Sequence, residues 1–131
     1  MDRKNLIKYL ICLIFFILIV NFFANKFYWY FSIWYFDMFM HFLGGFWAAL
    51  ACLYLFPPKD SSFNSILRIW FLVLCIGIGW EVFEILVNDV IIRNPFNPLD
   101  TFSDIFFDLA GGATAILYFL KRIIPEGRIG I

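Results

Sequence analysis

Charged residues are scarce in this sequence. Lys, Arg, Asp and Glu make up 15% of its 131 residues, whereas 63% are hydrophobic and 23% are aromatic. Soluble globular proteins carry about 25% charged residues, because a surface in contact with water must be polar. The composition therefore excludes a soluble domain. It predicts that most of the outer surface faces lipid, so that the lipid bilayer is the first expected partner.

An excess of basic charge is also absent. Ten Lys and Arg residues balance ten Asp and Glu residues, so the formal net charge is zero. Nucleic-acid binding depends on clustered basic residues that contact phosphates, and a nucleic-acid partner is therefore excluded. Cysteine is rare as well, and Cys12, Cys52 and Cys75 stand in apolar stretches without CxxC spacing. We therefore expect them to pack as small hydrophobic side chains rather than to form a disulfide framework or a zinc site.

Four apolar segments are long enough to cross a bilayer, since a transmembrane helix needs about 20 mainly apolar residues. The segments cover residues 6–24, 37–56, 68–87 and 102–120. The first is not followed by a small-residue cleavage site, so we expect it to be retained as a span. The sequence predicts an all-α polytopic membrane protein, in which residues 1–131 form a single domain of four transmembrane helices.

The distribution of charges predicts the orientation of the helices. Eight of the ten Lys and Arg residues lie near the N-terminus, between the second and third segments or in the C-terminal tail, whereas Lys26 and Arg93 lie on the opposite side. Because Lys and Arg accumulate on the cytoplasmic side, we expect both termini in the cytoplasm and a multi-pass protein of the cytoplasmic (inner) membrane. Most acids fall on the outer side: Asp37, Glu81, Glu84, Asp89, Asp100, Asp104 and Asp108.

Several of these acids lie within the predicted helices, together with the single histidine. With a rise of 1.5 Å per residue, His41, Glu81 and Asp108 share one level, roughly 20 to 24 Å from the cytoplasmic face of a core about 30 Å thick. Three more acids lie about one turn further out on the same helices: Asp37, Glu84 and Asp104. Spacings of three and four residues align these groups on one face of each helix.

The buried acids need a neutralising partner. One acid near the bilayer centre costs about 2.5 to 3.5 kcal/mol, and no Lys or Arg occurs at this depth. Protons, a bound cation or a cationic substrate group could neutralise the acids. An oxygen-rich ligand set favours the divalent cations Mg²⁺, Mn²⁺ or Ca²⁺, and Zn²⁺ fits if His41 is a ligand. The candidate metal ligands are Asp37, His41, Glu81, Glu84, Asp104 and Asp108.

Simpler roles are open for the same residues. Asp100 follows Pro98-Leu99 and is expected to be a helix N-cap rather than a ligand. Asp89 is expected to be a solvated acid in a loop. The deeper acids and His41 could also form a hydrogen-bonded network that only joins the helices, because such polar contacts are common between membrane helices.

A short internal repeat covers part of this region. Segments 37–50 and 104–117 agree at Asp, Phe, Gly-Gly, Ala and Leu positions with a constant offset of 67 residues. Both are expected to run from outside to inside, so the repeat predicts two helical hairpins related by an axis along the membrane normal. The Gly44-Gly45 and Gly111-Gly112 pairs would let helix backbones approach closely.

Three motifs together resemble a bacterial membrane-protein family. They are Asp37-x-x-x-His41-Phe42-x-Gly44-Gly45, Glu81-x-x-Glu84, and Asp100-Thr101-x-x-Asp104 followed by Gly111-Gly112. Over residues 37–117 the pattern is similar to the YjdF-type inner-membrane proteins and, more distantly, to the VanZ-like proteins. The resemblance implies a small bacterial multispanning protein. The association of VanZ-like proteins with glycopeptide (teicoplanin) resistance implies a role at the cell envelope.

Three functions follow from these expectations. An enzyme would use the bound metal on a lipid-linked or cell-envelope substrate, with Glu81 or Glu84 as general base. A transport or channel subunit would bind a proton or cation with the same acids, and would need to form a homo-oligomer. A structural or interaction protein would use the acids only to join helices. The sequence has no HExxH motif, phosphate-binding loop or Ser-His-Asp set that would decide for catalysis.

Overall fold

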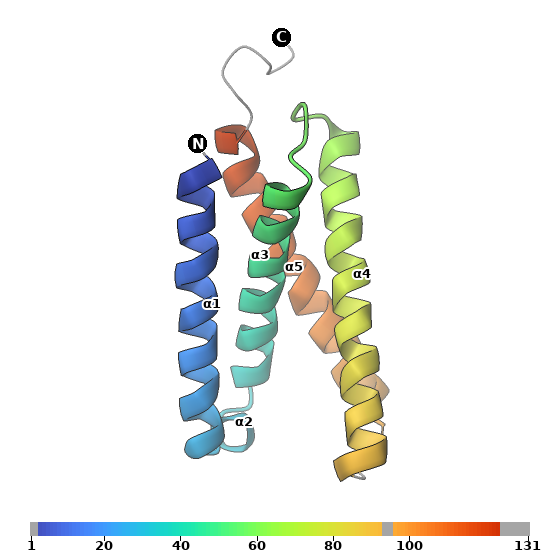
Figure 1. The fold of residues 1–131 in the computed structure, drawn as a ribbon. Coiled ribbons are helices and arrows are strands. Elements are labelled where there is room, and N and C mark those ends of the chain that lie inside the picture. Colours follow the sequence, from blue (N-terminus) through green and yellow to red (C-terminus); the bar gives the residue numbers. More distant parts are fainter. Residues whose placement is uncertain (1–2, 93–95, 124–131) are drawn as a thin grey trace.

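The computed structural model describes residues 3–92 and 96–123, and these residues form a bundle of four long helices (Figure 1). The long helices are α1 (Arg3–Lys26), α3 (Phe36–Leu55), α4 (Phe63–Val87) and α5 (Pro98–Ile123). A short helix α2 (Trp29–Ser32) follows α1, and a π-helical turn η1 (Asn88–Ile92) follows α4. No strand occurs in the described part of the chain, and four helices are long and apolar enough to span a membrane. The all-α, four-span prediction is confirmed.

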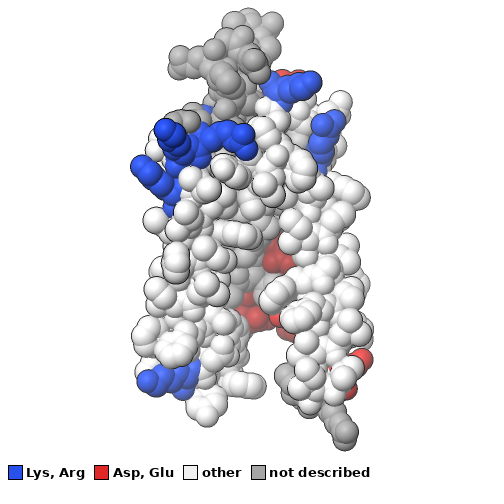
Figure 2. Space-filling model, viewed as in Figure 1, with Lys and Arg blue, Asp and Glu red and all other residues white. Residues whose placement is uncertain are grey.

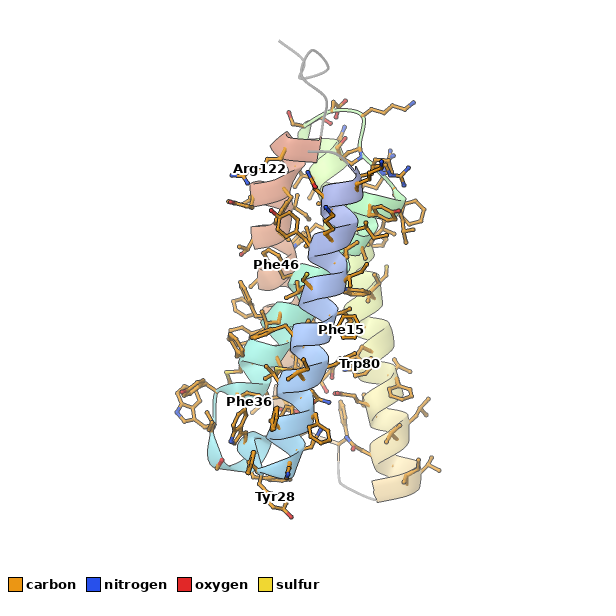
Figure 3. All side chains as sticks on the ribbon, turned by 60° about the vertical axis from the view of Figure 1, so that its left-hand side comes forward. Phe15, Tyr28, Phe36, Phe46, Trp80 and Arg122 are labelled. Carbon is orange, nitrogen blue, oxygen red and sulfur yellow. The ribbon has the colours of Figure 1, made fainter. Side chains whose placement is uncertain are left out.

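The helices alternate in direction, so that α3 and α5 run parallel to each other and antiparallel to α1 and α4 (Figure 1). The start of α1, the α3–α4 connection and the end of α5 share one end of the bundle, which we call the basic end. Lys and Arg side chains gather there, whereas Lys26 lies at the opposite end (Figure 2). Arg122 and Tyr28 mark these two ends in Figure 3. The predicted orientation also depends on Arg93 and Arg128, which lie outside the described residues.

Local sequence signals explain where two of the helices begin. Ser62 caps α4, because its side chain accepts a hydrogen bond from the backbone N–H of Ser65. At the start of α5, the side chain of Asn97 accepts a hydrogen bond from the N–H of Leu99 at 3.2 Å. The expectation that Asp100 is the N-cap was therefore wrong, because the helix already begins at Pro98. Asp89 is exposed as expected, but it lies in η1 rather than in a loop.

The half of the bundle toward the basic end has an apolar interior. Leu50, Leu53, Ile69 and Ile116 are at most 1% exposed and belong to one hydrophobic cluster that all four long helices share. The indole N–H of Trp47 donates to the backbone carbonyl of Leu10 at 2.9 Å and fixes α1 against α3. Outward-facing side chains are also apolar, as Figure 3 shows for Phe15 on α1, and this is the surface that a lipid environment requires.

Helices α3 and α5 approach each other most closely at glycines. A Cβ atom on Gly45 would overlap the backbone carbonyl of Asp108, and one on Gly111 would overlap the carbonyl of Phe42. Gly44, by contrast, has nothing within 4 Å of such an atom. The expected close approach therefore occurs, through one glycine of each pair. The hairpin repeat itself stays a prediction, although its equivalent positions His41 and Asp108 contact each other.

Candidate metal centre

Four polar side chains are buried in the half of the bundle away from the basic end. His41 on α3, Glu81 on α4, and Asp104 and Asp108 on α5 are 8%, 3%, 2% and 7% exposed. Three helices thus contribute to one polar interior, which begins where the apolar cluster ends. The sequence expectation that His41 and Asp108 share a level agrees with the contact between their side chains.

His41 lies between carboxylates on both sides of its imidazole ring. Its Nδ1 is 3.1 Å from Oδ1 of Asp108, and its Nε2 is 3.4 Å from Oδ2 of Asp104. A third carboxylate, that of Asp37, lies 3.7 Å from Nε2. A carboxylate that accepts the N–H of one imidazole nitrogen is the usual way in which a metal-binding histidine is oriented. The opposite nitrogen then presents its lone pair toward other carboxylates, and a cation or a proton between them removes the repulsion.

One group of side chains could hold a metal ion. His41, Glu81, Glu84 and Asp104 each offer a ligand atom, and these atoms lie within 4.8 Å of one another. Within this group, Oε1 of Glu81 is buried and has no hydrogen-bond partner among the described residues. A buried carboxylate oxygen without a partner is unusual, because its lost hydration is not compensated. The described residues therefore leave this oxygen of Glu81 available to a proton or to a bound cation.

The neighbouring side chains position this group. The indole N–H of Trp80 donates to Oε1 of Glu84 at 2.9 Å, which holds the carboxylate one turn from Glu81. Asp108 packs against α4 at Gly77, where a Cβ atom would lie only 2.9 Å from Oδ2 of Asp108. A larger residue at position 77 would compete with Asp108 for that space. The buried carboxylate next to His41 thus depends on a glycine of the facing helix.

A second group of carboxylates adjoins the first. Asp37, Asp100 and Asp104 offer oxygens that also lie within 4.8 Å of one another, so Asp104 belongs to both groups. Five of the six predicted ligands fall in these groups. Asp108 falls in neither and contacts the far side of His41 instead. Asp100, which the sequence did not favour as a ligand, joins the second group.

A cleft of about 610 Å³ leads to these carboxylates. Figure 2 shows it as a recess between the two sides of the bundle, with acidic side chains visible inside. Asp37, Glu84 and Asp100 line it, and Lys and Arg are absent from its lining as far as the structure describes the chain. The remaining lining residues are mostly aromatic: Tyr30, Phe31, Trp34, Trp80 and Phe83, with Val87 and Asn88. The sequence did not predict this cleft.

Tyr30, in α2 at the mouth of the cleft, is held in its protonated form. Partial burial, with the negative charges of Asp37 and Glu84, raises the pKa of the Tyr30 hydroxyl to about 12. The hydroxyl donates to Oδ1 of Asn21 at 2.6 Å. Its polar atom is therefore already engaged, and Tyr30 contributes mainly ring surface to the cleft.

Comparison with known proteins identifies a family. The family of predicted membrane proteins DUF2238 matches residues 2–123, which is nearly the whole chain. The chain belongs to this family. Membership of DUF2238 is consistent with the resemblance to YjdF-type proteins and with a protein that resides in a lipid bilayer. No curated protein and no solved structure matches the chain.

Proposed function

We propose that this DUF2238 protein binds a divalent cation within the membrane and uses it on a lipid-linked or cell-envelope substrate. The proposed ligands are His41, Glu81, Glu84 and Asp104. The observation that carries this proposal is the buried, unpartnered Oε1 of Glu81, whose carboxylate belongs to a group with three other potential ligands. A cation would compensate both this oxygen and the charge of the surrounding carboxylates.

Asp108 has a different role in this proposal. Its carboxylate accepts from Nδ1 of His41 at 3.1 Å, so that Nε2 is directed toward Asp104. We therefore assign Asp108 to orienting the histidine, and not to direct ligation. One imidazole with three carboxylates suits Mn²⁺ or Zn²⁺ and accommodates Mg²⁺ or Ca²⁺.

A bound cation would supply Lewis-acid chemistry, by polarising a substrate oxygen or acidifying a water molecule. Of the two candidate general bases, Glu84 lines the cleft, whereas Glu81 is buried behind it. The chain itself would hold the carboxylates in place. Its apolar cluster would exclude water from the interior between the carboxylates and the basic end. The aromatic residues that line the cleft favour a substrate that resides in the membrane.

The orientation of the protein is part of the proposal. The excess of Lys and Arg at the basic end favours a cytoplasmic location for that end, with the cleft facing the outer side of a bacterial cytoplasmic membrane. The distant VanZ-like resemblance agrees with a substrate of the cell envelope.

Two other functions compete with this one. A purely structural network is favoured by the His41–Asp108 hydrogen bond, which already joins α3 to α5. A transport or channel function has less support, because Leu50, Leu53 and Ile116 fill the interior between the centre and the basic end. A polar path would therefore have to form between copies of the chain.

Metal analysis tests the proposal. The full chain is purified in detergent without chelators, and its metal content is measured by mass spectrometry. We expect about one divalent cation per chain in the wild type, a strongly reduced content in Glu81→Gln, and an unchanged content in Asp89→Asn, which alters an exposed acid outside both groups. Wild-type protein that binds no divalent cation, even after equilibration with each of the four ions, would contradict the proposal.

A further inference from the structure

We infer that the cleft and the second carboxylate group receive the primary ammonium headgroup of a membrane amphiphile. The group consists of Asp37, Asp100 and Asp104, whose oxygens lie within 4.8 Å of one another. This inference rests on the proposed function, because Asp104 belongs to both groups, and it names the substrate class of the same site.

The charge balance of the site calls for a cationic ligand. Six carboxylates lie together here, and none of the described residues that line the cleft is Lys or Arg. A protonated His41 and one divalent cation together carry three positive charges, half of what six ionised carboxylates would need. We therefore expect the ligand that enters from the cleft to present a positively charged group to the carboxylates. An anionic headgroup without a positive group would increase the imbalance.

The geometry of the second group matches a primary ammonium. This headgroup has three N–H donors and no acceptor, and each donor can form a charge-assisted hydrogen bond with one carboxylate. The second group consists of three carboxylates, and two of them, Asp37 and Asp104, also face Nε2 of His41 at 3.7 and 3.4 Å. Asp104 is 2% exposed and Asp100 is exposed, so the acceptors extend from the buried centre to the cleft.

The walls of the cleft are suited to the same headgroup. Aromatic side chains from α2, α4 and the α2–α3 connection line it, and aromatic rings attract ammonium groups through their π faces. The hydroxyl of Tyr30 is bonded to Asn21, and the indole N–H of Trp80 is bonded to Glu84. These polar atoms are already used within the chain, so Tyr30 and Trp80 offer mainly apolar ring surface to a ligand.

Two further features indicate a ligand in the combined site that the two carboxylate groups form by sharing Asp104. The unpartnered Oε1 of Glu81 is buried at its inner end, and the cleft of about 610 Å³ opens at its outer end. The exposed side chains of Phe31 and Trp34 at the mouth, 87% and 80% accessible, provide apolar surface for the hydrocarbon part of an amphiphile.

The test uses the full chain in an uncharged maltoside detergent and short-chain phospholipids as probes. Dihexanoyl phosphatidylethanolamine carries a primary ammonium, phosphatidylcholine carries no N–H donor, and phosphatidylglycerol carries no amine. We expect phosphatidylethanolamine alone to raise the melting temperature of the wild type. Asp100→Asn and Asp37→Asn should each weaken its apparent affinity at least about tenfold, a change that corresponds to about 1.4 kcal/mol. Asp89→Asn should bind it like the wild type.

The metal content of the same samples separates the possible failures. A response to phosphatidylethanolamine that Asp100→Asn removes supports this inference even if the wild type holds no metal and the proposed function fails. Equal responses to the three lipids would overturn this inference alone, whatever the metal content. Two cations per chain in the wild type and one in Asp100→Asn would also overturn it, since the second group would then be a second metal site.

Discussion

The carboxylate of Asp108 on α5 lies 3.1 Å from Nδ1 of His41 on α3, one turn from the close approach of the two helices at Gly45. This pair turns Nε2 of the imidazole toward Asp104 at 3.4 Å and so directs His41 into the four-residue group. In the proposed cation site, this contact between two helices would orient the histidine ligand.

Asp108→Asn should weaken cation binding without unfolding the protein. Asparagine keeps the size of the side chain but loses the negative charge that supports the His41 N–H. Loss of such an orienting partner lowers metal affinity by about 10- to 100-fold. Calorimetric titration with Mn²⁺ or Zn²⁺ measures this change, with Asp89→Asn as the control. A cation affinity equal to that of the wild type would contradict the proposed role of Asp108 in orienting His41.

Gly45→Ala should destabilise the bundle, whereas Gly44→Ala should not. A Cβ atom at position 45 would overlap the backbone carbonyl of Asp108, but at position 44 it has nothing within 4 Å. Such overpacking costs about 1 to 3 kcal/mol, because the helices must separate. Thermal unfolding in detergent compares the two variants directly. Equal melting temperatures of the Gly45→Ala and Gly44→Ala variants would contradict the close approach of α3 and α5 at Gly45.

The start of α4 should depend on the ionisation of Asp60. Its Oδ1 accepts hydrogen bonds from the backbone N–H and hydroxyl of Ser62 and from the hydroxyl of Ser65, and these bonds lower the pKa of Asp60 to about 2. Because the folded-state pKa is below the ordinary value of 3.8, the stabilisation is complete above about pH 5 and is lost as the pH falls through 3.8 toward 2. A carboxyl NMR titration should give a midpoint near 2 in the wild type and a higher midpoint in Ser65→Ala. Ser61→Ala is the control, and a wild-type midpoint near 3.8 would contradict the interaction.

The orientation can be tested with single cysteines at Ser61 and Asn97, in a chain whose three native cysteines have been replaced. Position 61 lies at the basic end, and position 97 precedes α5 at the opposite end. We expect a membrane-impermeant thiol reagent, added to intact cells, to label position 97 and not position 61. The reverse pattern would place the cleft on the cytoplasmic side.

The position of the buried polar residues along the bundle axis could be predicted from the sequence, but the role of each residue could not. A constant rise per residue brings His41 and Asp108 to the same height, and they are in contact. Which side of the imidazole each carboxylate occupies depends on how α3 and α5 rotate and cross at Gly45. Residue counting contains no information on that rotation, so Asp108 could not be distinguished from Asp104 as a candidate ligand.

The start of α5 and the cleft were missed for different reasons. The predicted fourth span begins at residue 102 and α5 at Pro98, although Asn is favoured at N-cap positions and Pro at the first helical position. Placing the helix start there moves Asp100 from the cap into the helix, next to Asp104 and Asp37. The cleft combines aromatic residues about fifty positions apart in the sequence, and only the packing of α4 relative to α2 and α3 brings them together.

The most direct test of the central claim is the effect of Glu81→Gln on cation-dependent stability. A cation that binds only the folded state raises its stability by about 2.7 kcal/mol at a concentration one hundred times its Kd. The melting temperature of the wild type should therefore rise as Mn²⁺, Mg²⁺, Ca²⁺ or Zn²⁺ is added, for at least one of these ions. The Glu81→Gln protein should stay folded without the ion and show little or no rise. A Glu81→Gln protein that keeps the full cation response would contradict the account and leave a structural polar network as the better explanation.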